Sequence, residues 1–182
     1  EHLLAGWFSK VRLFNVMITK DNLQCRRNRL ALPGGSVVLG DGPMPYFTGS
    51  HLLNRGYYYC FRVHAIDEDF PGDSGCSLAL GVSRLSPKER RLQGSSCPLH
   101  AYEIPGVVCV GYGSTFVDEC KWYAAPWGTK GLQLGDTLGL FIPSDGDLVV
   151  YLNGAQVFRA GTTLGASKLS RKSYYPIVDL CG

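Results

Sequence analysis

Hydrophobic and polar side chains alternate along much of the chain, and a period of two predicts short β-strands. The alternation is clearest in residues 57–64, where every second side chain is large and apolar: Tyr57, Tyr59, Phe61 and Val63. Residues 76–83 repeat it, with Leu78, Leu80 and Val82 predicted to face inward and small residues on the other face. A face of small residues indicates close cover by a second sheet or by a loop.

A hairpin is predicted at residues 148–158, where Asn153-Gly154 separates two apolar runs. This dipeptide accepts the positive φ angles of a type I′ turn. The remaining expected strands are 6–14, 37–39, 107–112, 137–142 and 174–180.

Two stretches, 86–105 and 113–131, are expected to be long loops, the first with at most one helical turn at 87–92. No stretch has a helical pattern long enough for the crossover that joins parallel strands. We therefore predict an all-β fold, an antiparallel β-sandwich with long binding loops.

Composition supports this fold class. A length of 182 residues suits a single domain, 1–182, with one sizeable core. The chain has 45% hydrophobic residues, 18% charged residues and 23 glycines, as is typical of many short strands and tight turns. The net charge is only +3 and the basic residues are scattered, which argues against a nucleic-acid partner. No apolar run reaches the ~18 residues of a membrane-spanning helix, and no signal-peptide pattern is visible.

The cysteines and histidines indicate neither a metal site nor a cofactor. Seven cysteines include no CxxC pair, and no two of the four histidines have the spacing of metal ligands. Several cysteines lie in apolar strand patterns, such as Cys60 and Cys109, which indicates reduced, buried thiols. A reducing, cytoplasmic location is therefore expected.

The segment Pro71-Gly72-Asp73-Ser74-Gly75 resembles the nucleophile loop of chymotrypsin-like proteases. Ser74 precedes the midpoint of the chain, too early for that fold, and neither His51 nor His64 has the sequence context of the catalytic base. We interpret the segment as a glycine-rich turn and expect no enzymatic activity, with a serine hydrolase at Ser74 as an alternative. The neighbouring acidic stretch 67–73 lacks calcium-loop spacing and is interpreted as a solvated turn.

Aromatic side chains in the predicted loops leave two alternatives open. Trp122, Tyr123 and Trp127 lie within 113–131, and Tyr46, Phe47 and Tyr102 lie in other predicted loops. Such side chains either pack a long loop onto the core or form a binding surface. A carbohydrate-binding sandwich is an alternative function, indicated by the loop tryptophans Trp122 and Trp127.

Six segments resemble, in order, the neuralized homology repeat (NHR), a branch of the SPRY/B30.2 superfamily. The first joins Arg26-Arg27 to the strand GSVVL at 35–39 and the turn GPMP at 42–45. The others are YYYCFRV at 57–63, CSLALGVS at 76–83, LGDTLGL at 134–140, DLVVYLNG at 147–154 and YPIVDLCG at 175–182. The stretches 86–105 and 116–131 do not match the usual loops of the family, so the resemblance does not identify the partner.

The resemblance implies a protein-interaction module that binds a peptide or protein segment through its loops. The resemblance further implies a role as the substrate-recognition part of a ubiquitin ligase or as part of a scaffold, with any ligase activity outside these residues. By analogy with SPRY pockets, the expected peptide-binding residues are Arg27, Arg29, Tyr102, Trp122, Leu180 and Cys181. The arginine segment, Tyr102 and the last strand at 180–181 are expected to converge on one pocket. The isolated domain is expected to be a monomer.

Overall fold

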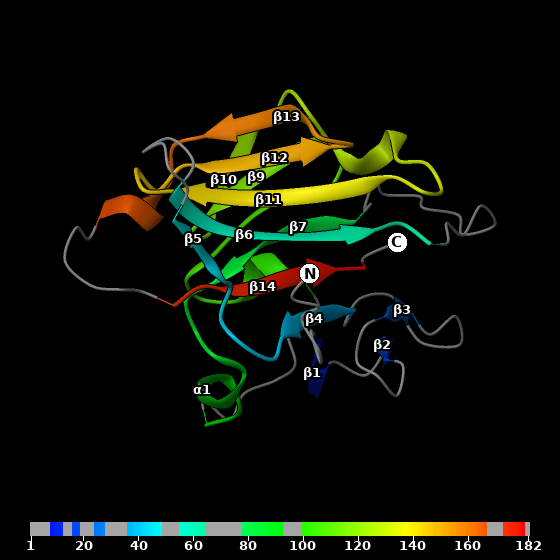
Figure 1. Cartoon of the computed structure of the whole chain (residues 1–182). Coiled ribbons are helices and arrows are strands. Elements are labelled where there is room, and N and C mark those ends of the chain that lie inside the picture. Colours follow the sequence, from blue (N-terminus) through cyan, green and yellow to red (C-terminus); the bar gives the residue numbers. More distant parts are fainter. Residues whose placement is uncertain are drawn as a thin grey trace.

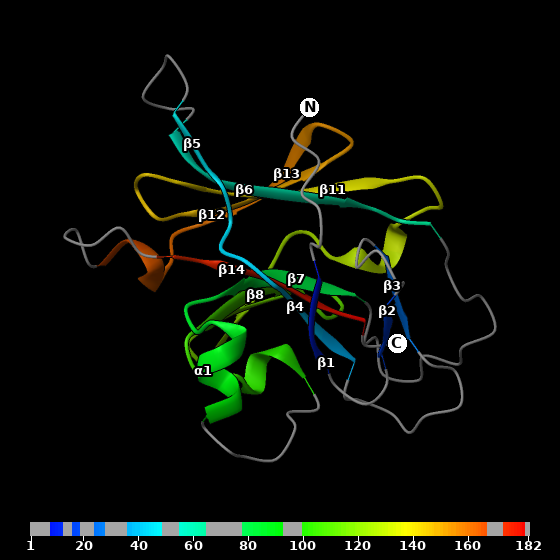
Figure 2. The same ribbon diagram turned by 60° about the horizontal axis from the view of Figure 1, so that its bottom comes forward.

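The computed structural model describes residues 8–12, 16–18, 24–27, 36–48, 55–64, 78–92, 100–166 and 173–180. Within these ranges the strands form two large sheets, which lie one above the other in Figure 2. Every strand pairing in the described ranges is antiparallel. The structure confirms the predicted fold class, an antiparallel all-β sandwich.

The larger sheet has seven strands. In spatial order they are β1 (Phe8–Arg12), β4 (Val37–Gly40), β14 (Tyr175–Asp179), β7 (Ala79–Ser83), β8 (Val107–Gly111), β9 (Thr115–Asp118) and β10 (Lys121–Ala124). β14, the latest of these strands in the sequence, lies between β4 and β7 (Figure 1).

The second sheet has five strands and covers one face of the first. Its spatial order is β13 (Ala155–Ala160), β12 (Leu148–Leu152), β11 (Thr137–Pro143), β6 (Arg55–Arg62) and β5 (Tyr46–Thr48). A separate two-stranded sheet joins β2 (Val16–Ile18) and β3 (Cys25–Arg27). The helical elements are α1 (Pro87–Leu92) and the 3₁₀ turns η2 (Ala101–Glu103), η3 (Thr129–Gly131) and η4 (Thr163–Ala166).

The main core lies between the two large sheets. Leu80 and Val82 enter it from β7, as the alternation predicts, and both are fully buried. Leu138 and Leu140 enter it from β11 on the other side, and are also fully buried. Each fully buried side chain of this kind stabilises the fold by roughly 1.5–3 kcal/mol through the area it removes from water.

Tyr59 of β6 connects the two sheets through a hydrogen-bonded hydroxyl inside this core. Only 1% of the residue is exposed. Its hydroxyl lies 2.9 Å from the carbonyl oxygen of Gly81 and 3.1 Å from that of Ile177, and it accepts the N–H of Gly81 at 3.1 Å. Because these partners belong to β7 and β14, the hydroxyl fixes the position of one sheet relative to the other.

A second core covers the outer face of the seven-stranded sheet. It contains Ala79, Cys109 and Ile177 from the strands, with Ala101 and Ile104 from the segment around η2. Ala79 belongs to the small-residue face of β7. The predicted close cover of that face is therefore confirmed at this residue.

The hairpin predicted at Asn153-Gly154 is present between β12 and β13. Asn153 has a φ of 51° and Gly154 a φ of 84°, as a type I′ turn requires. The Asn153 side chain also accepts the N–H of Thr137 at 2.9 Å and donates to Asp136 at 2.8 Å, which ties the turn to β11.

Two parts of the loop prediction are wrong. Residues 113–131 contain β9, β10 and η3, and Tyr46 and Phe47 lie in β5. The turn between β9 and β10 consists of Glu119 and Cys120, with φ angles of 47° and 67°. Neither residue is the glycine or asparagine that normally marks such a turn, so the sequence pattern did not reveal this hairpin.

Candidate peptide-binding surface

The structure brings two of the predicted site residues, Tyr102 and Trp122, into contact. Tyr102 lies in η2, and its ring centroid is 4.6 Å from that of Trp122 in β10. Trp122 is paired with Val117, a member of the outer-face core, so the Trp122 side chain lies on the same outer face of the seven-stranded sheet.

His100 and Tyr112 extend this contact into a cluster of four rings. The His100 ring stacks on Tyr102 at 4.9 Å and 14°, and Tyr112 meets Tyr102 edge-on at 5.4 Å. We call His100, Tyr102, Tyr112 and Trp122 the aromatic platform. Trp122 is 52% exposed although its ring is held by Tyr102. The platform therefore presents the exposed Trp122 ring on a rigid support, with little conformational freedom to lose on binding.

A buried carboxylate lies beneath the platform. Asp179, at the end of β14, is 0% exposed. Its Oδ2 accepts the Tyr112 hydroxyl at 2.5 Å and the N–H of Ala101 at 2.9 Å, and the Nδ1 of His100 lies 3.8 Å away. A buried carboxylate is costly without such partners, so Asp179 holds η2 and Tyr112 against the sheet.

The same carboxylate controls the electrostatics of the platform. Its proximity raises the pKa of His100 above the usual value, which favours the protonated imidazole. Burial, followed by the negative charge of Asp179, raises the pKa of Tyr112, so that its hydroxyl remains a neutral donor at physiological pH.

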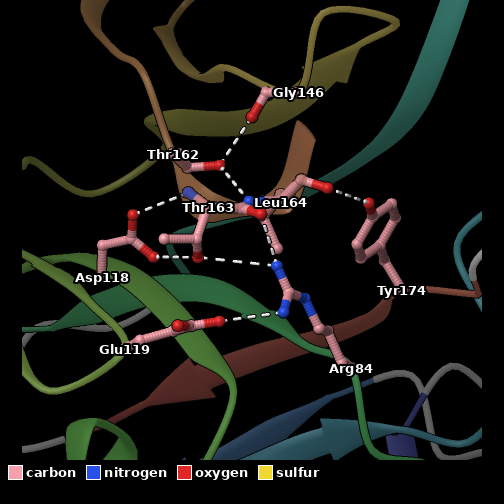
Figure 3. Close-up of polar contacts among 8 residues, drawn as sticks. All are labelled: Arg84, Asp118, Glu119, Gly146, Thr162, Thr163, Leu164 and Tyr174. Carbon is pink, nitrogen blue, oxygen red and sulfur yellow. Dashed lines mark hydrogen bonds and ion pairs between the residues drawn. The ribbon is translucent and has the colours of Figure 1, made fainter. Parts of the chain in front are cut away.

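A polar network anchors the turn of the hairpin that carries Trp122 (Figure 3). Arg84, which follows β7, donates to the Glu119 carboxylate at 2.9 Å and to the carbonyl of Thr163 at 2.7 Å. Asp118 is buried and accepts both the hydroxyl and the N–H of Thr163, at 2.7 and 2.8 Å. At this end of the β9–β10 hairpin, Asp118 is therefore bound to η4 directly and Glu119 through Arg84.

The network continues from η4 to the five-stranded sheet. Thr162 donates its hydroxyl to the carbonyl of Gly146, in the β11–β12 turn, at 2.6 Å and accepts the N–H of Leu164 at 2.9 Å. The hydroxyl of Tyr174 donates to the carbonyl of Leu164 at 3.2 Å. These contacts fix the turn end of the β9–β10 hairpin relative to both sheets (Figure 3).

The other described members of the predicted site lie elsewhere. Arg27 is in β3, opposite Val16. Leu180 follows β14 and packs near Val16 and Val38 in a small separate cluster. Because Leu180 is the neighbour of Asp179, whose side chain lies under the platform, alternation places Leu180 on the opposite face of the sheet. The described residues therefore do not form the single pocket that was expected.

Arg29 and Cys181 fall outside the described residues, as do Ser74 and His51. His64 is described, follows β6 and is exposed. Among the described residues no three His, Cys, Asp or Glu side chains are placed to hold a metal ion. No helix in the described ranges is long and apolar enough to cross a membrane.

The two loop tryptophans have different environments. Trp127 is partly buried against the main core, whereas Trp122 is half exposed on the platform. His100, Tyr112 and Asp179 belong to this surface but were not predicted from the sequence. An acidic residue inside the apolar run 176–180 is the one signal for a buried carboxylate that requires partners.

Two solved structures resemble this one over most of its length. The crystal structure of the Neuralized NHR1 domain from Drosophila melanogaster has a TM-score of 0.65 and 14% sequence identity, covering 96% of this chain and 92% of that chain. The solution structure of the NHR domain in Neuralized from the same organism has a TM-score of 0.63 and 16% identity, covering 97% and 85%. No family model and no curated protein sequence matches the chain. At these identities the similarity is one of fold.

Proposed function

The chain has the fold of the neuralized homology repeat, and on this premise we propose that it is a protein-interaction module that binds a peptide segment of a partner at the aromatic platform. The observation that carries the proposal is the exposed Trp122 ring packed against Tyr102 at 4.6 Å. Exposed large aromatic side chains that are held rigidly are typical of the residues that dominate protein interfaces.

In this proposal residues 1–182 form one module, which binds a partner and catalyses no reaction on it. Binding of this kind would suit the substrate-recognition part of a ubiquitin ligase or a scaffold in a reducing compartment. Cys109 is buried, as predicted, but Cys60 is exposed, so the prediction of a buried thiol is wrong there. Both thiols, and the exposed Cys120, are unpaired within the described residues, which supports a reducing compartment.

The experiment that tests the proposal is selection of binding peptides from a displayed random library, followed by calorimetry on the selected sequences. Trp122→Ala and Tyr102→Ala are each expected to weaken binding about tenfold to a hundredfold, because the loss of an interface aromatic costs about 1.4–3 kcal/mol. The melting midpoint of Trp122→Ala should stay close to that of the wild type, since its ring is largely outside the core.

Phe47→Ala is the matched control. Phe47 is 49% exposed, similar to Trp122, but lies on β5 in the other sheet. Its removal should leave peptide binding unchanged. Failure to select any peptide, or selection of peptides that bind Trp122→Ala as well as the wild type, would overturn the proposal.

A second candidate function, carbohydrate binding, is favoured by a shallow hollow on the five-stranded sheet. The hollow has a volume of about 260 Å³ and is lined by Phe47, Tyr58, Phe141 and Tyr151. Aromatic rings of this kind can stack on sugar faces. Glycan-array binding that is lost in Phe47→Ala or Tyr151→Ala, but kept in Trp122→Ala, would favour this function over peptide binding.

A further inference from the structure

β10 is an edge strand with an open side. It is the last strand of the seven-stranded sheet, and among the described residues it pairs with β9 alone. All four of its residues are exposed, including the aromatic side chains Trp122 and Tyr123. An edge strand offers its outward N–H and C=O groups to any extended chain that approaches it.

The hairpin register identifies which backbone groups point outward. Lys121 and Asp118 flank the two-residue turn and form the first hydrogen-bonded pair, as in type I′ hairpins. The N–H of Ala125 donates to the carbonyl of Ser114 at 2.9 Å, so residue 125 also bonds inward. Odd-numbered residues therefore bond to the β9 side. Trp122 and Ala124 direct their N–H and C=O groups to the open side, where no residue of the described ranges bonds to them.

The edge of the five-stranded sheet on the same side of the sandwich, where Phe158 of β13 meets Phe116 of β9, differs in ways that hinder strand addition. β13, at the edge of the five-stranded sheet, has a register shift opposite Val150 and Tyr151. It also carries Arg159, bound to Asp145 and Asp147. Irregularities and charges of this kind protect edge strands from pairing. β10 keeps an unbroken register with β9 and carries two exposed aromatic side chains.

We propose that an extended segment of a partner protein binds β10 as an additional strand of the seven-stranded sheet. This inference rests on the proposed function, because it specifies how the peptide reaches the aromatic platform. Backbone groups of the segment bond to Trp122 and Ala124, while its alternate side chains lie on the two faces of the sheet.

The side chains of β10 specify the chemistry of that segment. The face of Trp122 and Tyr102 accepts a large apolar side chain. The other face presents Tyr123, whose ring is 5.7 Å from that of Phe116, and accepts a second apolar side chain. Lys121 is exposed, and no ion pair within the described residues involves it. Lys121 therefore favours an acidic residue in the partner segment, near the end of β10 that follows the β9–β10 turn.

A partner peptide fits this edge better than a second copy of the chain. Four residues of strand extend about 14 Å, and a stable dimer buries about 800 Å² on each partner. Pairing of two such short edges falls short of that area. A peptide needs only the backbone bonds and the platform contacts.

The central variant is Ala124→Pro. Proline removes the outward N–H of residue 124 and no inward hydrogen bond, and proline is tolerated on strand edges that face solvent. With a library-selected peptide, the affinity of Ala124→Pro should fall about tenfold or more, while its melting midpoint stays near the wild-type value. Ala124→Ser, which keeps the N–H, is the matched control and should bind normally.

A scan of the same peptide by N-methylation of successive backbone amides tests the geometry from the other side. Affinity should fall at every second residue over the bound segment, because only alternate amides of an added strand face β10. If Ala124→Pro lowers the melting midpoint, this scan alone decides whether the peptide binds as an added strand.

Each outcome has one meaning. A peptide that loses affinity to Trp122→Ala, binds Ala124→Pro normally and shows no alternate pattern overturns strand addition and leaves the proposed function standing. Absence of any selected peptide overturns both. A concentration-dependent dimer that Ala124→Pro abolishes assigns the edge to a second copy and overturns the partner segment.

Discussion

At the scale of single residues, Asp179 connects the interior of the sheet to the exposed platform. Its carboxylate is buried, and two of its neighbours, Tyr112 and Ala101, donate hydrogen bonds to it. His100 is the third neighbour and the one whose charge changes near neutral pH. The protonation of His100 is therefore coupled to the stability of η2 on the sheet.

This coupling gives a pH dependence with a definite sign. The pKa of His100 is raised in the folded protein above the value of about 6.5 expected in the unfolded chain. The protonated imidazole therefore contributes stability that is complete below about pH 6 and is lost as the pH rises through the raised pKa. Melting midpoints measured between pH 5.5 and 8.5 should show this loss in the wild type and a smaller loss in His100→Gln.

His64→Gln is the control for this measurement, because His64 is exposed and follows β6, away from the carboxylate. Its profile should match that of the wild type. Coincident profiles for His100→Gln and the wild type would contradict the coupling.

At the scale of elements, the β12–β13 hairpin shows how local sequence fixes local structure. Gly154 has a φ of 84° with no atom within 4 Å of the position that a Cβ would take. The turn thus requires a left-handed backbone conformation at residue 154, although there is space for a side chain.

Gly154→Val should therefore destabilise the domain by about 1 kcal/mol or more, through backbone strain alone. Gly154→Asn, which tolerates the left-handed region, should have a smaller effect. Chemical denaturation of the two variants measures the difference, and equal midpoints would contradict the strain argument.

The sequence predicted those strands whose alternation or turn residues are unambiguous. β6, β7, β11 and the β12–β13 hairpin match their expected positions. β9 and β10 were missed because Glu119 and Cys120 adopt positive φ without being typical turn residues. Such a turn is stabilised from outside, here by the bond from Arg84 to Glu119, and contacts distant in sequence have no local signature.

At the scale of the whole molecule, the relative position of the two sheets depends on polar contacts as well as on packing. The Tyr59 hydroxyl is the clearest case, because it bonds to the backbone of β7 and β14 from within the apolar core. Burial also raises the pKa of Tyr59 beyond any physiological range, so the hydroxyl stays protonated.

Tyr59→Phe should destabilise the domain by about 1–3 kcal/mol, because it leaves the N–H of Gly81 without its hydroxyl acceptor. The melting midpoint should fall by several degrees. Tyr46→Phe, which removes a hydroxyl from an exposed ring, should leave it unchanged. An unaltered midpoint in Tyr59→Phe would mean that packing alone determines the relative position of the two sheets.

The candidate site was predictable only in part, because it too depends on contacts between segments that are distant in sequence. Tyr102 and Trp122 were both among the predicted binding residues. They lie in η2 and β10, however, and only the tertiary fold shows that their rings are in contact. The expected convergence with Leu180 came from analogy of fold. Strand alternation places that side chain on the other face, beside Val38.

The position of β14 has a consequence for the order in which the fold can assemble. β14 is latest in the sequence but lies inside the seven-stranded sheet, where Ile177 pairs with Leu39 on one side and with Gly81 on the other. Pairings between segments so distant in sequence slow folding, because a long loop must close before they form. In a chain emerging from the ribosome, β1 and β4 can pair with each other but cannot join the rest of this sheet until residues 175–179 have been made. The sheet therefore remains in two separate parts, the pair β1 and β4 and the group β7 to β10, until the strand between them is made.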